Sequence, residues 1–439
     1  MPIMWYRIHA ELGLSPTPLT YDMLVRAVDE RMGEAEDLDW KRELPPEVEK
    51  KQWEFAKDVA AMANTRGGLI VYGVREHEGD GNHAAGLTDV PNGERDLQAL
   101  RSHAHRYIRP LVDGLVIEAI DDPDGTGPGL IAVSVPSSPD APHVIGEKNR
   151  MGVPYRYGTD TNWMSESELE RAYRDRFTRR ADDRTALTAL IDGLRPEIDL
   201  SKGVWVAVAT RPVAPLPLLA APPSREQATE TMQAALTVAD GIFSWEQQGR
   251  PAVLQQLGFP PVENPRNGLR RWVIRSDHYA TDPAQLVDWA LVELHHDGSI
   301  ALAVGLAGFV SPSTELGGSH KPWPVPYRLV DAVVVEAVAL AAAHIRALGG
   351  VGTVLTRAVL LRDESTGRAP LVAVNNRLGH MLVEGEYRLV LGTRAVREPT
   401  AVETSFTAQD DDAALRQAAR QLADDLDQQF GIRNSSIPG

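Results

Sequence analysis

The feature that most constrains the fold is the stretch VAAMANTRGGLIVYGV at residues 59–74. An alanine-rich segment ends here, two glycines follow, and a run of apolar residues begins. We expect Gly67 or Gly68 to end a helix, because a left-handed backbone at a helix C-terminus strongly favours glycine. The run from Leu69 to Val74 contains almost no polar side chain, which predicts a strand buried on both faces.

A second strand is predicted before this helix. Residues 38–41 alternate, with Leu38 and Trp40 on one face and Asp39 and Lys41 on the other. Two prolines at 45 and 46 open the helix between the two strands. A strand, a helix and a strand in this order predict a crossover unit.

Further elements extend this unit into a domain. Residues 20–32 predict an amphipathic helix with Thr20 as N-cap and Gly33 as C-cap. Downstream we expect a basic helix at 92–110, strands at 115–120 and 130–135, and a helix capped by Ser165. The predicted fold class is α/β (α+β), with a mixed sheet and helices. The predicted boundaries are a helical extension at 1–33 and a domain at 34–185.

The second half predicts another α+β domain at 200–431, of unknown role. Its clearest signals are a strand at 204–210, a hairpin that turns at Asp297-Gly298, and a long helix at 327–348. Residues 432–439 are expected to form a flexible tail.

Composition limits the possible functions. The 439 residues contain no cysteine, which excludes disulfides, thiolate zinc sites and a cysteine nucleophile and fits a reducing cytoplasm. No apolar run is long enough to cross a membrane, and the N-terminus does not resemble a secretory signal. The net charge of −16 is unlike that of a protein that coats nucleic acid, so a polyanionic partner needs a local basic patch.

Three carboxylates and a lysine flank the two predicted strands. Glu34 precedes the first strand, Asp39 and Lys41 share one of its faces, and Glu76 follows the second strand. Converging carboxylates repel one another unless a cation lies among them, and Mg²⁺ or Mn²⁺ suits oxygen ligands. Such an ion activates water and holds phosphate oxygens, while a lysine offsets developing negative charge. The alternative from the residues alone is a solvated acidic strand edge.

Five separated blocks resemble the Schlafen-type AlbA-like domain, over about residues 34–177. The blocks are EAEDLDWKRELP, VAAMANTRGGLIVYGV, Gly86-Leu87, VPSSPDAPH and YRYGTDTNWMSESEL. In nuclease members of that family, three acidic residues bind a divalent metal and cut tRNA or other structured RNA. The resemblance implies that Glu34, Asp39 and Glu76 are the metal ligands and that Lys41 is the catalytic lysine. Asp39 stands where the family usually has glutamate, and Glu76 where it has aspartate.

Nucleic-acid contacts are predicted at two places. Arg101, Arg106 and Arg109 form a patch on the basic helix, and Arg156 and Thr161 lie in the last block of the resemblance. The arginine-rich segment 171–184 is interleaved with acids, so we interpret it as a salt-bridged solvent face. For Asn64 a structural cap is favoured over a role with a ligand.

The leading hypothesis is a metal-dependent endoribonuclease that acts on tRNA or other structured RNA in bacterial defence against phage. One alternative is a non-catalytic nucleic-acid-binding transcriptional regulator, with RNA or DNA as partner. Another is a scaffold whose acidic surface binds protein, and a homo-oligomer stays open. No Gly-x-x-x-x-Gly-Lys-Ser/Thr loop occurs, so the sequence gives no support for an ATPase.

Overall fold

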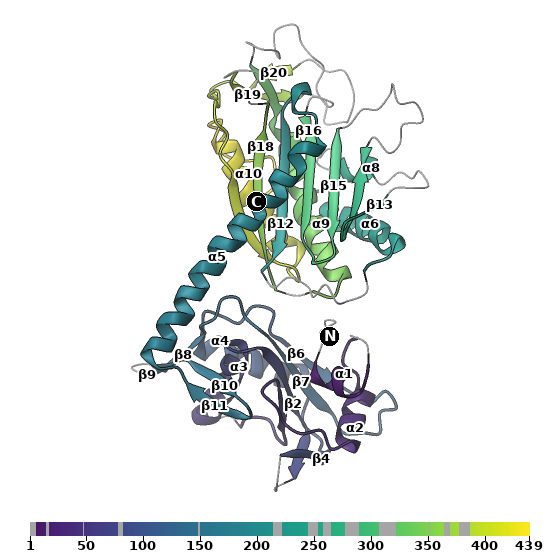
Figure 1. The fold of residues 1–439 in the computed structure, drawn as a ribbon, viewed down its shortest axis with the longest axis vertical. Helices are drawn as coiled ribbons and strands as arrows, with labels where there is room; N and C mark the ends of the chain where they lie inside the picture. The colour runs from purple at the N-terminus through teal and green to yellow at the C-terminus, as the bar shows by residue number, and fades with distance from the viewer. Residues whose placement is uncertain are drawn as a thin grey trace. The chain divides into compact units, whose positions relative to one another are not determined.

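The computed structural model describes residues 6–14, 17–46, 48–77, 82–147, 150–213, 222–244, 253–257, 265–276, 289–306, 322–350, 352–363, 369–376 and 387–439. The chain divides into two compact units, Met1–Asp182 and Asp183–Gly439 (Figure 1). Helix α5 (Glu166–Leu194) begins in the first unit and ends in the second. Both units combine helices with sheets, which confirms the predicted fold class.

The first unit is built on a mixed four-stranded sheet in the order β1-β2-β7-β6. Strands β1 (Leu38–Lys41) and β2 (Gly67–Tyr72) are parallel and are joined by α3 (Glu49–Ala63), which confirms the predicted crossover unit. Both β7 (Leu130–Pro136) and β6 (Val116–Ile120) run antiparallel to their neighbours. Short strands complete the unit: β3 (Val74–His77), β4 (His83–Leu87), β5 (Ile108–Arg109), β8 (Val144–Glu147), β9 (Arg150–Gly152), β10 (Pro154–Tyr157) and β11 (Asp160–Trp163).

Separate hydrophobic cores cover the two faces of this sheet. Helices α3 and α4 (Glu94–Tyr107) pack on one face, with Ile70 of β2 in that core. Helices α1 (Arg7–Glu11) and α2 (Tyr21–Asp29) pack on the other face, around Trp40. Side chains alternate between the faces because successive strand residues point in opposite directions. The segment predicted as an N-terminal extension is therefore part of the first unit's own core.

The paired glycines serve a different purpose from the one predicted. Helix α3 ends at Ala63 with Asn64 as a right-handed cap, so neither glycine ends it. Gly67 begins β2 with φ of +74°, and a Cβ there would lie 2.6 Å from the carbonyl oxygen of Val135. A Cβ at Gly68 would lie 2.7 Å from the carbonyl oxygen of Asp37. Glycine is needed because the backbones of neighbouring segments approach closely.

The second unit contains a seven-stranded antiparallel sheet in the order β13-β14-β15-β16-β12-β18-β21. Its strands are β12 (Trp205–Pro212), β13 (Arg266–Gly268), β14 (Arg271–Arg275), β15 (Ala290–His295), β16 (Ile300–Gly305), β18 (Thr353–Leu361) and β21 (Val402–Thr407). A smaller sheet contains β17 (Trp323–Pro326), β19 (Leu371–Asn376) and β20 (Tyr387–Leu389). The helical elements are η1 (Arg195–Glu197), η2 (Leu200–Lys202), α6 (Arg225–Ile242), α8 (Val253–Leu257), α9 (Tyr327–Ala347) and α10 (Asp412–Gln428).

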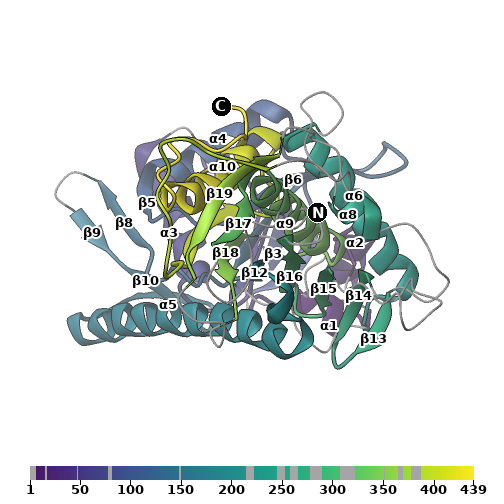
Figure 2. The same cartoon turned by 90° about the horizontal axis from the view of Figure 1, so that it is seen from above.

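Helix α9 forms the centre of the second unit's core. It is buried along nearly its whole length, and α6 and α10 lie beside it (Figure 2). The C-terminal segment also belongs to this core, because Ile437 is buried and Ser436 donates to the buried carboxylate of Asp331 at 2.6 Å. This anchoring corrects the expectation that residues 432–439 form a flexible tail.

Candidate functional site

The predicted carboxylate site is centred on Asp39 of β1. Asp39 is in register with Ile70, so its side chain lies on the α3 face of the sheet, and it is 3% exposed. The Nζ atom of Lys41 lies 2.5 Å from Asp39 Oδ2, and Arg156 Nη2 donates to Asp39 Oδ1 at 3.1 Å. Both oxygens of the carboxylate are thus paired with a cation.

Arg156 reaches Asp39 from β10 and is itself buried, with 3% of its side chain exposed. Its backbone N–H donates to the hydroxyl of Thr65 at 2.9 Å. Asn64 holds the same region together, since its amide donates to the carbonyls of Pro154 and His143 and its oxygen accepts from the backbone N–H of His143. The structural role predicted for Asn64 is confirmed. Separate motif blocks of the sequence therefore meet in one hydrogen-bonded network.

Glu34 lies next to this pair and is also engaged. Its Oε1 accepts from the backbone N–H of Trp40 at 3.0 Å, and its Oε2 accepts from Asn82 Nδ2 at 3.1 Å. Burial, together with the negative charge of Asp39, raises the pKa of the Glu34 carboxyl above its ordinary value. The same two causes raise the pKa of Asp58, an acid of α3.

Glu76 is an exposed residue of β3. Burial of part of the side chain and the negative charge of Glu34 raise the pKa of its carboxyl. For Lys41, burial alone would lower the pKa, but the charge and hydrogen bonding of Asp39 outweigh it and raise the pKa. Glu34, Asp39, Lys41 and Glu76 are therefore electrostatic neighbours. We call these four residues, with Asp58 and Arg156, the charged cluster.

Sequence reasoning missed two members of this cluster in their actual roles. Asp58 was not considered, although an acid among the apolar residues of α3 was a visible signal. Arg156 was predicted to contact nucleic acid, and this is corrected, because its guanidinium is buried against Asp39. The arginine in the last motif block thus neutralises the central acid.

The charged cluster does not fit a bound divalent cation in this arrangement. Within the described parts of the chain, no group of three or more histidine, aspartate or glutamate side chains is placed to hold a metal ion. A cation beside Asp39 would also face the positive charges of Arg156 and Lys41. The predicted ligand set of Glu34, Asp39 and Glu76 is near in space but is not assembled as a coordination site.

The other predicted nucleic-acid contacts lie nearer the surface. Arg101 pairs with Glu94 at 2.9 Å and donates to the carbonyl of Ile117. The guanidinium of Arg106 lies 5.0 Å from the ring centre of Tyr107. Arg109 donates to two backbone carbonyls, and Thr161 is half-buried opposite Arg156 in β11. The guanidinium groups of Arg101 and Arg106 on α4 and of Arg109 on β5, which the sequence placed on one helix, are thus each engaged by a neighbouring group of the domain.

Two exposed apolar side chains that the sequence did not predict as contacts lie on β9 and β11. Strand β5, which carries Arg109, pairs with β8, and β8 pairs with β9. Met151 of β9 is 77% exposed, and Trp163 of β11 is 48% exposed while its ring lies over Gly152. We call Arg109, Met151 and Trp163 the hairpin surface; in the strand register Arg109 and Met151 lie on one face of the β5-β8-β9 sheet, and the ring of Trp163 covers Gly152 on the other face. The β8–β9 hairpin that carries Met151 is seen at the left of Figure 2.

The arginines of α5 follow the prediction only in part. Arg174 pairs with Glu170, and both Arg176 and Arg180 pair with Asp140. The expected solvent-facing bridge along the helix is found for Arg174 and Glu170, whereas Arg176, with 14% of its side chain exposed, and Arg180 pair with an acid outside the helix. Among the described helices, none is long and apolar enough to cross a membrane.

Comparison with known proteins identifies the first unit. Residues 34–165 match the model of the family described as Schlafen, AlbA_2. This region is a Schlafen AlbA_2 domain. The match covers less than half of the chain and includes Glu34, Asp39, Glu76 and Arg156. Membership of this domain family supports a nucleic-acid-related function.

Two solved structures are similar to parts of the chain. The N-terminal domain of an ATP-dependent DNA helicase RecG-related protein from Nitrosomonas europaea is 21% identical, with a TM-score of 0.23, over 30% of this chain and 85% of that chain. A protein from Corynebacterium diphtheriae is 16% identical, with a TM-score of 0.21, over 54% of this chain and 36% of its own. With TM-scores this low, neither structure supports an inference about the site. None of the curated proteins compared with the chain matches it.

Proposed function

We propose that the Schlafen AlbA_2 domain of this chain binds nucleic acid without cutting it, as expected of a regulator. The observation that carries this proposal is the pairing of Asp39 with Arg156 and Lys41. These internal cations neutralise the central acid that a metal-dependent nuclease would need for its ion. The domain family supports the nucleic-acid-related part of the proposal.

The hairpin surface is the proposed contact for the polymer. Aromatic side chains bind unpaired bases by stacking, which contributes about 1–3 kcal/mol per base, while cations contact the backbone phosphates. Trp163 supplies an exposed ring and Arg109 an exposed cation whose guanidinium is already positioned by two carbonyls. Single-stranded RNA or DNA, or an RNA loop, is the form that offers unpaired bases.

The test uses fluorescently labelled single-stranded RNA, tRNA and single-stranded DNA with the full chain, followed by anisotropy. We expect saturable binding that weakens at higher salt and that falls about tenfold in Trp163→Ala, as loss of one stacked base predicts. Val48→Ala removes another exposed apolar side chain of the same unit and should leave affinity unchanged. Absence of binding to all three polymers would favour the protein-binding scaffold and refute the proposal.

A metal-dependent endoribonuclease acting on tRNA or other structured RNA is the second candidate. The negative charge of Glu34 raises the pKa of Glu76, and this repulsion favours the nuclease, because a bound cation would relieve it. It requires Asp39 to leave its two cationic partners. Gel analysis of the same RNA samples with Mn²⁺, Mg²⁺ or chelator tests it. Cleavage that needs metal and disappears in Glu34→Ala and Glu76→Ala would show that the domain is a nuclease and not only a binding domain. A role of that nuclease in defence against phage would then be the next hypothesis to test.

A further inference from the structure

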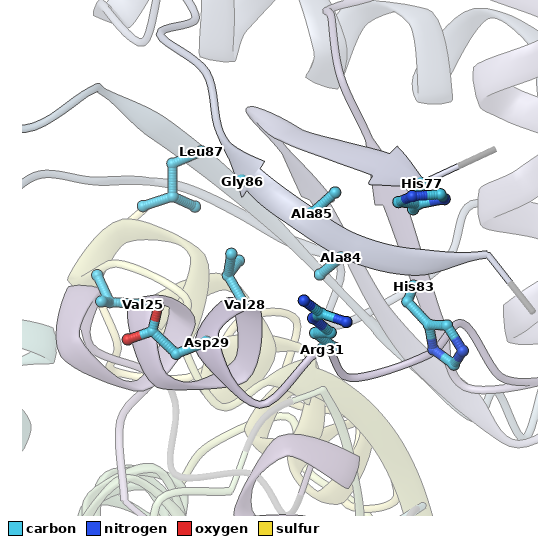
Figure 3. Close-up of a pocket in the computed structure, with 10 residues that line it drawn as sticks. All are labelled: Val25, Val28, Asp29, Arg31, His77, His83, Ala84, Ala85, Gly86 and Leu87. Carbon is cyan, nitrogen blue, oxygen red and sulfur yellow. The ribbon is translucent and has the colours of Figure 1, made fainter. Parts of the chain in front are cut away.

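A pocket separate from the hairpin surface lies between α2 and the β3–β4 hairpin (Figure 3). Its volume of about 690 Å³ is within the range of small-molecule sites, roughly 300–1,000 Å³. The lining includes Val25, Val28, Asp29, Arg31, His77 and His83. None of them belongs to the charged cluster.

The lining of this pocket has two chemically different ends. Figure 3 shows Val25, Val28 and Leu87 at one end, where they form an apolar wall. Arg31, His77 and His83 lie toward the other end and present nitrogen donors. His77 and His83 are directly opposite each other in the β3–β4 pairing. We call Arg31, His77 and His83 the donor end.

Arg31 is placed at the pocket by an unusual backbone. Helix α2 ends at Asp29, and Arg31 takes a left-handed conformation with φ of +53°, which the sequence had assigned to Gly33. The next residue is fixed, because the carbonyl of Met32 accepts from Ala84 N and from the indole N–H of Trp40. Among the described residues no carboxylate forms an ion pair with Arg31, and the Asp29 carboxylate points away from it in Figure 3.

We infer that this pocket binds a mononucleotide, with its phosphate at the donor end and its base against the apolar wall. A guanidinium matches the oxygens of a phosphate geometrically, and imidazole N–H groups add donors beside it. A flat base fits the wall of Val25, Val28 and Leu87, whose burial contributes affinity that inorganic phosphate cannot gain. This inference does not depend on the proposed binding of a nucleic-acid polymer.

The variant Arg31→Gly tests the donor end with little risk to the fold. Glycine adopts positive φ without strain, so the backbone after α2 is preserved while the guanidinium is removed. Arg26→Gln is the matched control, since Arg26 is an exposed arginine of α2 that pairs with Glu30 and does not line the pocket. Circular dichroism and thermal unfolding verify that both variants fold.

Isothermal titration of the full chain with AMP, with adenosine and with inorganic phosphate gives the readout. We expect the wild-type chain to bind AMP more tightly than it binds adenosine or inorganic phosphate. The affinity for AMP should fall at least tenfold in Arg31→Gly and should not change in Arg26→Gln. Equal binding of AMP and adenosine would overturn the assignment of phosphate to the donor end. Absence of AMP binding at millimolar concentration, or AMP affinity equal in Arg31→Gly and the wild type, would overturn the inference as a whole.

Discussion

Replacing Asp39 by asparagine should destabilise the first unit strongly. The variant keeps the shape of the side chain and removes its charge. Arg156, with 3% of its side chain exposed, would then hold a buried charge without a counter-ion. Loss of one partner from a buried ion pair costs about 3–5 kcal/mol in unfolding free energy. An amide oxygen can still accept one hydrogen bond from Arg156, so we expect the lower end, about 3 kcal/mol.

Lys41 adds less to this loss, because 35% of its side chain is exposed and water screens its interaction. The control is Glu43→Gln. It removes the charge of an acid that pairs with Arg42 at the surface, where the side chains of Arg42 and Glu43 are 66% and 76% exposed. Exposed pairs contribute about 0–1 kcal/mol, so this change should be small. The double variant Asp39→Asn with Arg156→Met should recover part of the loss, because it removes the uncompensated cation as well.

The assay is urea unfolding of the full chain, with hydrogen–deuterium exchange of peptides from β1 and β2 to report on the first unit. A two-unit chain need not unfold in one step, so a local probe is needed. If Asp39→Asn shifts the urea midpoint of these peptides no further than Glu43→Gln does, the buried pair is not a main source of stability and the reasoning fails.

Two further predictions concern packing and pH. Gly67→Ala should lower the free energy of unfolding, measured by chemical denaturation, by more than about 3 kcal/mol, because the new Cβ meets backbone atoms. Gly158→Ala should lower it by only about 1 kcal/mol, because φ is also positive there, at +62°, but the space around it is open. Equal losses would refute the close-approach argument. Burial raises the pKa of Asp331 to about 6 and, with the charge of Asp331, that of Asp427 to about 9. Since the folded state then binds more protons, thermal stability of the second unit should fall between pH 5 and pH 8.5 and fall less in Asp427→Asn; a rise over that range would contradict it.

Much of the first unit's fold could be predicted from the sequence. The apolar alternation of residues 38–41 and the apolar run after Gly68 specify two buried strands, and the helix between them requires a parallel crossover. The glycine pair was recognised, but its reason was not. The clash that excludes a Cβ at Gly67 comes from Val135, and a contact so distant in sequence leaves no local signal.

The charged cluster could be predicted only in part. The sequence predicted that Glu34, Asp39 and Glu76 converge, and the raised pKa values agree with it, because the charge of Asp39 contributes to that of Glu34 and the charge of Glu34 to that of Glu76. The partner that changes the chemistry, Arg156, lies 117 residues beyond Asp39 and reaches it through a strand positioned by Asn64. Arg156 lies in a motif of mostly polar residues, so its sequence context does not indicate that its side chain is buried. The hairpin surface was missed for the same reason, since only the strand order β5-β8-β9 places Arg109 and Met151 on one face of a small sheet.

The central claim is that internal cations, and not a divalent metal, neutralise the acids of the charged cluster. Titration of the metal-free full chain with Mn²⁺, followed by electron paramagnetic resonance of the free ion, measures this directly. The account predicts no stoichiometric Mn²⁺ binding at sub-millimolar concentration, with Glu34→Gln indistinguishable from the wild type. One tightly bound Mn²⁺ per chain that is lost in both Glu34→Gln and Glu76→Gln would contradict it.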